Sequence, residues 1–204
     1  MNKKTISILM LLSFVIFGIK PVFSQEQTSR NSEGRFSFII PNDWEEYSEE
    51  TMKEISDAIS LQTNRHVKYD AGLQRIGHKL PYMYLIIRKS GKLTEKQIQD
   101  VISAQVQAKA HQEAAGAIDK SQLKDIITNY KYGELVYLPA RHLAVYTTQY
   151  FFNNKARISL NALFFSNYGS VQLMFFSSEE EFNSNLDDFN AIIYSFKFDK
   201  GYEY

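Results

Sequence analysis

The chain has 204 residues, of which 44% are hydrophobic and 14% aromatic, and its 23 basic residues balance 23 acidic ones. This balance excludes the strongly basic surface that recruits nucleic acid or anionic lipid. The absence of cysteine excludes disulfides, thiolate nucleophiles, zinc-thiolate sites and the acylated cysteine of a lipoprotein.

The first 24 residues have the pattern of a secretory signal peptide. Lys3 and Lys4 precede an apolar run over residues 5–19, and Ser24 and Gln25 flank the expected cleavage point. The run is shorter than the roughly 20 residues that a helix needs to cross a bilayer. We therefore expect cleavage, and a periplasmic or extracellular protein that is not a lipoprotein and has no membrane anchor.

The remaining 180 residues fit one domain with a substantial core. The leader carries three lysines and no acid, so this part has 20 basic residues against 23 acidic ones. Residues 25–34 are polar and without periodicity, which predicts a flexible lead-in. We expect a single domain over residues 35–198 and a C-terminal tail over 199–204.

The first half of this domain predicts two strands, one helix and a long loop. Alternating apolar residues predict a strand over 35–40, and Thr51 begins a capping-box spacing that predicts a helix to about Thr63. Residues 64–80 show no clean period and are expected to form a loop, while the apolar run over 82–88 predicts a strand.

The second half predicts a helix, an antiparallel meander and a closing helix. Thr94 opens a capping box for a helix that reaches toward Gly116, and Ser178 opens another for the closing helix. Turn residues separate the expected strands, which cover 130–138, 142–152, 155–166, 170–177 and, as a short final strand, 196–198. The elements predict an α+β fold.

Both ends of the domain resemble PsbP-like domains. The segment Gly34-Arg-Phe-Ser-Phe-Ile-Ile-Pro-Asn-Asp-Trp44 is similar to their strand–Pro–x–x–Trp entry, and Asp188-Phe-Asn-Ala-Ile-Ile-Tyr-Ser-Phe196 to their closing helix and Ser-Phe exit. Leu138-Pro-Ala-Arg141 resembles the turn that enters the central hairpins. The resemblance covers residues 34–198.

This resemblance implies a three-layer α/β/α sandwich, with a central antiparallel sheet of about six strands and helices on both faces. It also implies a binding or assembly protein rather than an enzyme. No catalytic motif or cofactor comes with it, so no functional residue is transferred.

Aromatic residues are the first candidates for a binding site. Trp44 could stack on a sugar or peptide, or it could lock a corner of the fold against the core. Tyr146, Tyr150 and Phe152 share one face of a strand. Helices that cover both faces of the sheet would account for this pattern. A face left open would instead offer an apolar pocket or a surface for a partner.

The expected loop supplies the second candidate. His66, Asp70 and His78, with Tyr69 beside them, offer nitrogen and oxygen ligands to a divalent metal, although their spacing matches no motif. The alternative is that they are solvated loop residues.

The sequence therefore favours an exported, soluble, non-enzymatic module that binds a protein partner or a small apolar ligand, without a cofactor. The common nucleotide and hydrolase motifs are absent. A secreted hydrolase with an unrecognised Ser, His and acid constellation, and a metal-binding periplasmic protein, are the alternatives.

Overall fold

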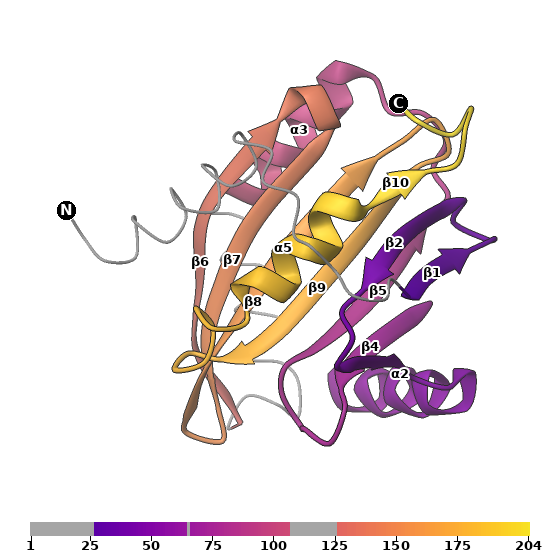
Figure 1. Ribbon diagram of the computed structural model, residues 1–204. Coiled ribbons are helices and arrows are strands. Elements are labelled where there is room, and N and C mark those ends of the chain that lie inside the picture. Colours follow the sequence, from indigo (N-terminus) through magenta and orange to yellow (C-terminus); the bar gives the residue numbers. More distant parts are fainter. Residues whose placement is uncertain (1–26, 65, 107–125) are drawn as a thin grey trace.

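The computed structural model describes residues 27–64, 66–106 and 126–204. The leader, the cleavage point between Ser24 and Gln25, His111 and the predicted helix end at Gly116 lie outside these residues. Within them the fold is α+β, with three α-helices, a large antiparallel sheet and a smaller one (Figure 1).

The large sheet has seven strands in the order β3-β4-β5-β9-β8-β7-β6, and every neighbouring pair is antiparallel. The small sheet has the order β1-β2-β10. The strands are β1 (Gln27–Asn31), β2 (Phe36–Ile40), β3 (Trp44–Glu46), β4 (Ala71–Arg75), β5 (Tyr82–Arg88), β6 (Ile127–Leu138), β7 (Leu143–Phe152), β8 (Lys155–Phe165), β9 (Ser170–Ser178) and β10 (Lys197–Phe198). The helices are α2 (Glu49–Thr63), α3 (Glu95–Val106) and α5 (Leu186–Ser195), and Pro139–Arg141 forms a 3-10 turn.

Local sequence signals account for the meander from β6 to β9. The predicted strands match the observed ones to within three residues at every end. Between β7 and β8, Asn153 and Asn154 both have positive φ, at 50° and 59°. This is the geometry of a two-residue hairpin, and asparagine tolerates it.

Apolar side chains cover both faces of the large sheet. On one face, α5 and the small sheet pack against the main core through Phe189, Ile192 and Phe36, and Figure 1 shows α5 lying across this face. On the opposite face, Ile98 and Ile102 of α3 pack against β7 and β8 in a separate apolar cluster. The sheet therefore separates two unequal cores.

The first strand and the composition of the sheets differ from the sequence-based expectation. Residues 27–31, expected to belong to a flexible lead-in, form β1, which pairs with β2 along its whole length. The strand is polar because it is an exposed edge, so its order comes from backbone hydrogen bonds. The sheet prediction also changes, because β2 lies in the small sheet and the large sheet has seven strands rather than about six.

Residues 64–80, expected to form a loop, contain β4. Gly72, in β4, permits close approach of α2. A Cβ at this position would lie 2.8 Å from the Met52 sulfur and 2.9 Å from the Met83 carbonyl oxygen. This strand position therefore requires glycine, because a larger residue would collide with α2 and β5.

The observed starts of the helices differ in detail from the predicted capping boxes. Ser48, rather than Thr51, caps α2, because its hydroxyl accepts a hydrogen bond from the Thr51 backbone N–H. The box at Thr94 forms as predicted. At Ser178 the hydroxyl accepts from the Glu181 N–H, but turns follow and α5 begins only at Leu186.

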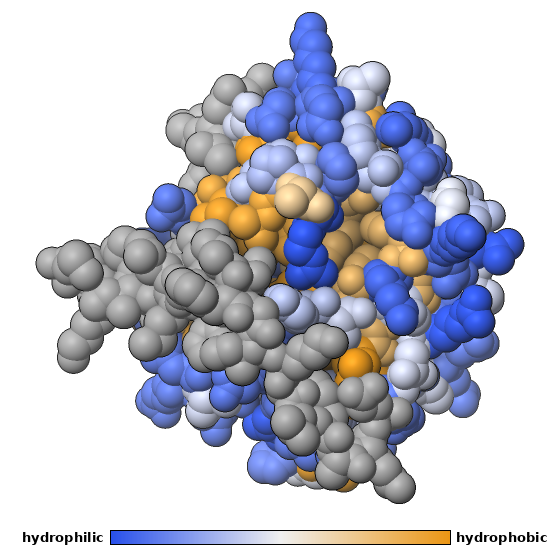
Figure 2. Space-filling model, turned by 45° about the horizontal axis from the view of Figure 1, so that its top comes forward, coloured by the Kyte–Doolittle hydropathy of each residue, from blue (hydrophilic) through white to orange (hydrophobic). Residues whose placement is uncertain are grey.

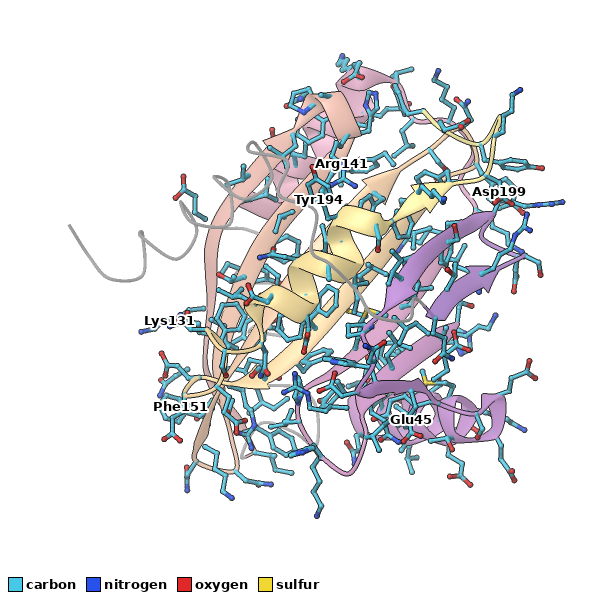
Figure 3. The ribbon with its side chains drawn as sticks, in the orientation of Figure 1. Glu45, Lys131, Arg141, Phe151, Tyr194 and Asp199 are labelled. Atoms are coloured by element: carbon cyan, nitrogen blue, oxygen red, sulfur yellow. The ribbon has the colours of Figure 1, made fainter. Side chains whose placement is uncertain are left out.

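Arg141 connects the 3-10 turn to the end of α5. Its guanidinium donates to the carbonyl oxygens of Ile193, Tyr194 and Phe196 at 3.1, 3.3 and 3.4 Å. Figure 3 shows Arg141 beside Tyr194 at this helix end. A cation that satisfies terminal carbonyls stabilises a helix, which gives the Leu138–Arg141 motif a structural role.

The tail over residues 199–204 is packed rather than free. The Asp199 N–H donates to the Arg35 carbonyl at 2.7 Å. The Tyr204 hydroxyl donates to the Leu93 carbonyl at 2.7 Å, and its ring lies 3.8 Å from that of His142.

Candidate binding site

Trp44 belongs to the core and is 1% exposed. Its ring meets Phe189 edge to face at a centroid distance of 6.2 Å, and its Nε1 donates to Asp188 Oδ2 at 3.1 Å. The indole face is therefore closed to a ligand in this structure. This corrects the stacking expectation in favour of the corner-locking one, and Trp44 leaves the candidate site.

The contact between Trp44 and Asp188 joins the two PsbP-like motifs, because each motif contributes one of the two residues. Arg75 completes the junction. It forms ion pairs with Asp43 and Asp188 and donates to Asn185 Oδ1 at 2.8 Å. The motifs therefore hold the β3 corner against α5.

The structure does not bring His66, Asp70 and His78 together. His66 and Asp70 precede β4 and His78 follows it, and five strand residues span about 17 Å. The Asp70 carboxylate is already paired, with Lys68 at 2.8 Å and with the Ile87 N–H at 2.7 Å. No group of three metal-ligating side chains occurs among the described residues. The metal prediction is therefore not supported.

The face of the sheet that α5 leaves free carries a regular arrangement of aromatic and small polar residues. Strand register places two rows side by side, each crossing five strands on one face. The first row is Tyr82, Phe176, Ser159, Thr148 and Tyr132, and the second is Tyr84, Met174, Asn161, Tyr146 and Leu135. We call these rows, with the adjacent Tyr69, Tyr130 and Tyr150, the tyrosine face.

Aromatic rings form two walls of the tyrosine face. On the β5 and β9 side, Tyr82 stacks on Phe176 at 4.9 Å and Tyr84 lies 4.7 Å from Tyr69. On the β6 and β7 side, the rings of Tyr130, Tyr132, Tyr146 and Tyr150 follow one another at 5.4–6.1 Å. Such contacts stabilise aromatic clusters beyond their buried area.

Small polar residues form the floor between these walls. Thr148, Ser159 and Asn161 are 2%, 3% and 5% exposed. The Thr148 and Ser159 hydroxyls lie 2.5 Å apart, and Asn161 Nδ2 donates to the Ser159 hydroxyl at 3.1 Å. Gln172 extends the network, donating to the Tyr146 hydroxyl at 3.3 Å. These short polar side chains are therefore almost fully buried between the two aromatic walls.

The described helices α2 and α3 lie at the margins of the tyrosine face. α2 packs on β4, where Met52 contacts Gly72. α3 packs on the next row along the strands, where Ala144 pairs with Leu163. Of the three described helices, none is centred on the first two rows.

Burial holds the phenols of the tyrosine face in their neutral form. It raises the pKa of Tyr146 to about 12, and it raises the pKa values of Tyr82, Tyr84 and Tyr150 still further above the ordinary value. These hydroxyls therefore act as hydrogen-bonding groups, rather than bases, near neutral pH.

We expect a loss of stability at alkaline pH. Unfolded tyrosines ionise near pH 10, whereas Tyr146 keeps its proton to about pH 12 in the folded chain. The unfolded state thus binds fewer protons above pH 10, so stability is complete below pH 10 and falls as pH rises through about 12. Denaturant unfolding between pH 8 and 12 should show this decline, and Tyr146→Phe should make it shallower. A pH-independent free energy of unfolding would contradict it.

Of the aromatic residues predicted from the sequence, Tyr146 and Tyr150 lie in the tyrosine face. Phe152 lies at the end of β7, is 39% exposed and pairs with Lys155 at the hairpin. The members that the sequence did not single out include those on β5 and β9. The sequences of these two strands are largely apolar and give no sign of a site. Only strand order and register place their aromatic residues on the same face as Ser159.

A second hollow lies between β1, β4 and α2, with a volume of about 510 Å³. His66 and Asp70 line it, so the expected loop does contribute to a concave surface. Its apolar floor includes Phe38 and Met83, which are 3% and 0% exposed. Its rim carries charges of both signs, and polar and apolar atoms contribute about equally to its exposed lining.

The described histidines do not support the hydrolase alternative. His142 Nδ1 lies 3.5 Å from Glu95 Oε1 and 3.4 Å from the Tyr137 hydroxyl. No serine hydroxyl is hydrogen-bonded to His66, His78 or His142 in the part of the chain that the structure describes.

No helix among the described residues is long and apolar enough to cross a membrane.

The fold is similar to that of cyanobacterial PsbP (CyanoP) from Synechocystis sp. PCC 6803. The two are 13% identical with a TM-score of 0.51, over 89% of this chain and 95% of that one. LpqN, described as involved in cell envelope biogenesis of Mycobacterium tuberculosis, is 14% identical with a TM-score of 0.44, over 86% and 91%. No protein-family model and no curated protein sequence matches the chain. The predicted PsbP-like fold is therefore confirmed, as a likeness of fold.

Proposed function

We propose that this chain is an exported, non-catalytic binding or assembly module, and that the tyrosine face is its binding surface. The observation that supports this most is the pairing of two aromatic walls with a small polar floor. A mostly apolar surface with a few convergent polar groups is typical of ligand sites. The leader pattern supports export of the mature domain.

A non-catalytic role fits the chemistry of the face. Its phenols are neutral near pH 7, and the floor groups hydrogen-bond one another. Neither set offers a poised base or an activated nucleophile. We also infer a three-layer α/β/α sandwich, because α5 packs on one face and α3 on the other.

Matched variants test the proposed surface. Tyr150 and Phe151 are neighbours on β7 whose side chains point to opposite faces, and Phe151 is 39% exposed. We expect Tyr150→Ala, alone or with Tyr84→Ala, to release a ligand or partner that the parent protein retains from an envelope extract. Phe151→Ala should leave binding unchanged.

Native mass spectrometry and affinity capture measure the retention, and circular dichroism checks that each variant is folded. Equal retention by the Tyr150→Ala and parent proteins would contradict the proposal. So would the absence of any retained molecule from the parent.

A further inference from the structure

The tyrosine face presents hydroxyl groups to which the described residues supply no hydrogen-bond partner. No described residue hydrogen-bonds the side-chain hydroxyls of Tyr82, Tyr84 or Tyr150, whereas Tyr146 is bonded by Gln172. A half-buried phenol loses free energy when a ligand covers its hydroxyl without supplying a hydrogen-bond partner. A ligand that supplies donors or acceptors at these three positions would therefore be favoured over one that does not.

The same residues present aromatic ring faces. Tyr82 and Phe176 stack with an interplanar angle of 26°, and Tyr84 is tilted by 37° to Tyr82. Ring faces and hydroxyl edges thus alternate over a short distance. The matching ligand has apolar C–H faces bordered by hydroxyl groups, which is the chemistry of a pyranose sugar.

The charge of the surface favours an uncharged ligand. The two rows contain no ionised side chain, and two cations, Arg157 near Tyr82 and Arg88 at Gln172, lie at their margins. A cationic ligand would be repelled by both arginines. An acyl chain would cover the three hydroxyls without pairing them, at a cost in desolvation.

The extent of the face indicates a chain of sugars. Each row crosses five strands, from β5 to β6. Strands lie about 4.8 Å apart, so four spacings span about 19 Å. A single ring would occupy only a part of this length.

We propose that the tyrosine face binds a neutral oligosaccharide, with pyranose rings stacked on the tyrosines and their hydroxyl groups paired with Tyr82, Tyr84 and Tyr150. This proposal rests on the proposed function, because it assigns a ligand class to the same surface. It predicts that the hydroxyl groups contribute to affinity separately from the rings.

Phenylalanine substitutions separate the two contributions. The triple variant Tyr82→Phe, Tyr84→Phe, Tyr150→Phe keeps ring area and shape but removes three hydroxyls. The probes are neutral hexasaccharides of β-1,4-glucose, α-1,4-glucose and β-1,4-N-acetylglucosamine, titrated by calorimetry, with a fluorescent fatty acid as the apolar probe. Tyr194→Phe is the control, since Tyr194 lies on α5 at the opposite face and is 39% exposed.

We expect at least one hexasaccharide to bind the parent protein and the Tyr194→Phe control equally. We expect the triple variant to bind it about tenfold more weakly or worse. If the triple variant is unfolded by circular dichroism, Tyr84→Phe alone replaces it, with an expected loss of about threefold.

The other outcomes overturn the inference in distinguishable ways. Binding of the fatty acid alone, lost in Tyr150→Ala, would overturn the sugar assignment and leave the proposed function in place. An unchanged hexasaccharide affinity in the triple variant would place the sugar elsewhere on the molecule. Failure of every probe, together with no retained ligand or partner from an extract, would overturn both proposals.

Discussion

Trp44→Ala is expected to lower the free energy of unfolding by about 3–5 kcal/mol. The indole is 1% exposed and packs edge to face on Phe189, so its removal leaves a large cavity. It also deprives Asp188 of one of its hydrogen-bond donors. Urea unfolding, followed by circular dichroism, measures the change.

Two variants show whether the loss comes from this junction. Trp44→Phe keeps most of the apolar volume but removes the Nε1 donor, so about 1–2 kcal/mol should be lost. Leu61→Ala, at a site that is 77% exposed on α2, should change stability by less than about 0.5 kcal/mol. A Trp44→Ala protein as stable as the Leu61→Ala protein would show that the two PsbP-like motifs do not depend on each other.

Gly169→Ala is expected to cost about 3 kcal/mol, because backbone atoms occupy the space that the new methyl group needs. Gly169 has φ of 147°, and a Cβ there would lie 1.9 Å from the Arg88 carbonyl oxygen and 2.8 Å from the Ser90 nitrogen. Neither atom can rotate away as a side chain would. The end of β5 would have to separate from the turn between β8 and β9.

Gly77→Ala is the matched control. Gly77 also has positive φ, at 75°, but no heavy atom lies within 4 Å of its Cβ position. This variant carries only the conformational cost of about 1 kcal/mol. Thermal and urea unfolding of both proteins should separate the clash from the backbone effect. Equal losses would contradict the close approach of β5 to this turn.

The sequence was most informative where the local pattern and the fold agree. The strand over 82–88 was predicted with its observed bounds, and the Asn153-Asn154 turn fixed the hairpin between β7 and β8. β1 and β4 were missed because neither carries such a pattern. β1 is polar and is ordered by its pairing with β2, while β4 contains the glycine that α2 requires.

The candidate site was only half visible in the sequence for a related reason. Tyr146 and Tyr150 share a face of one strand, which alternation alone reveals. Tyr82 and Phe176 join them through strand order and register, which no local pattern contains. The sequence left Trp44 open as either a stacking surface for a ligand or a core residue. In the structure it is buried against Phe189, as a core residue is.

Covalent labelling of tyrosine hydroxyls tests the central claim, that the tyrosine face is the binding surface. Folded protein is labelled with and without an envelope extract, and peptide mass spectrometry reads each site. We predict that the extract protects Tyr82, Tyr84 and Tyr150, while Tyr194 on the opposite face is labelled to the same extent in both samples. Protection of Tyr194, with unchanged labelling of Tyr84 and Tyr150, would contradict the account.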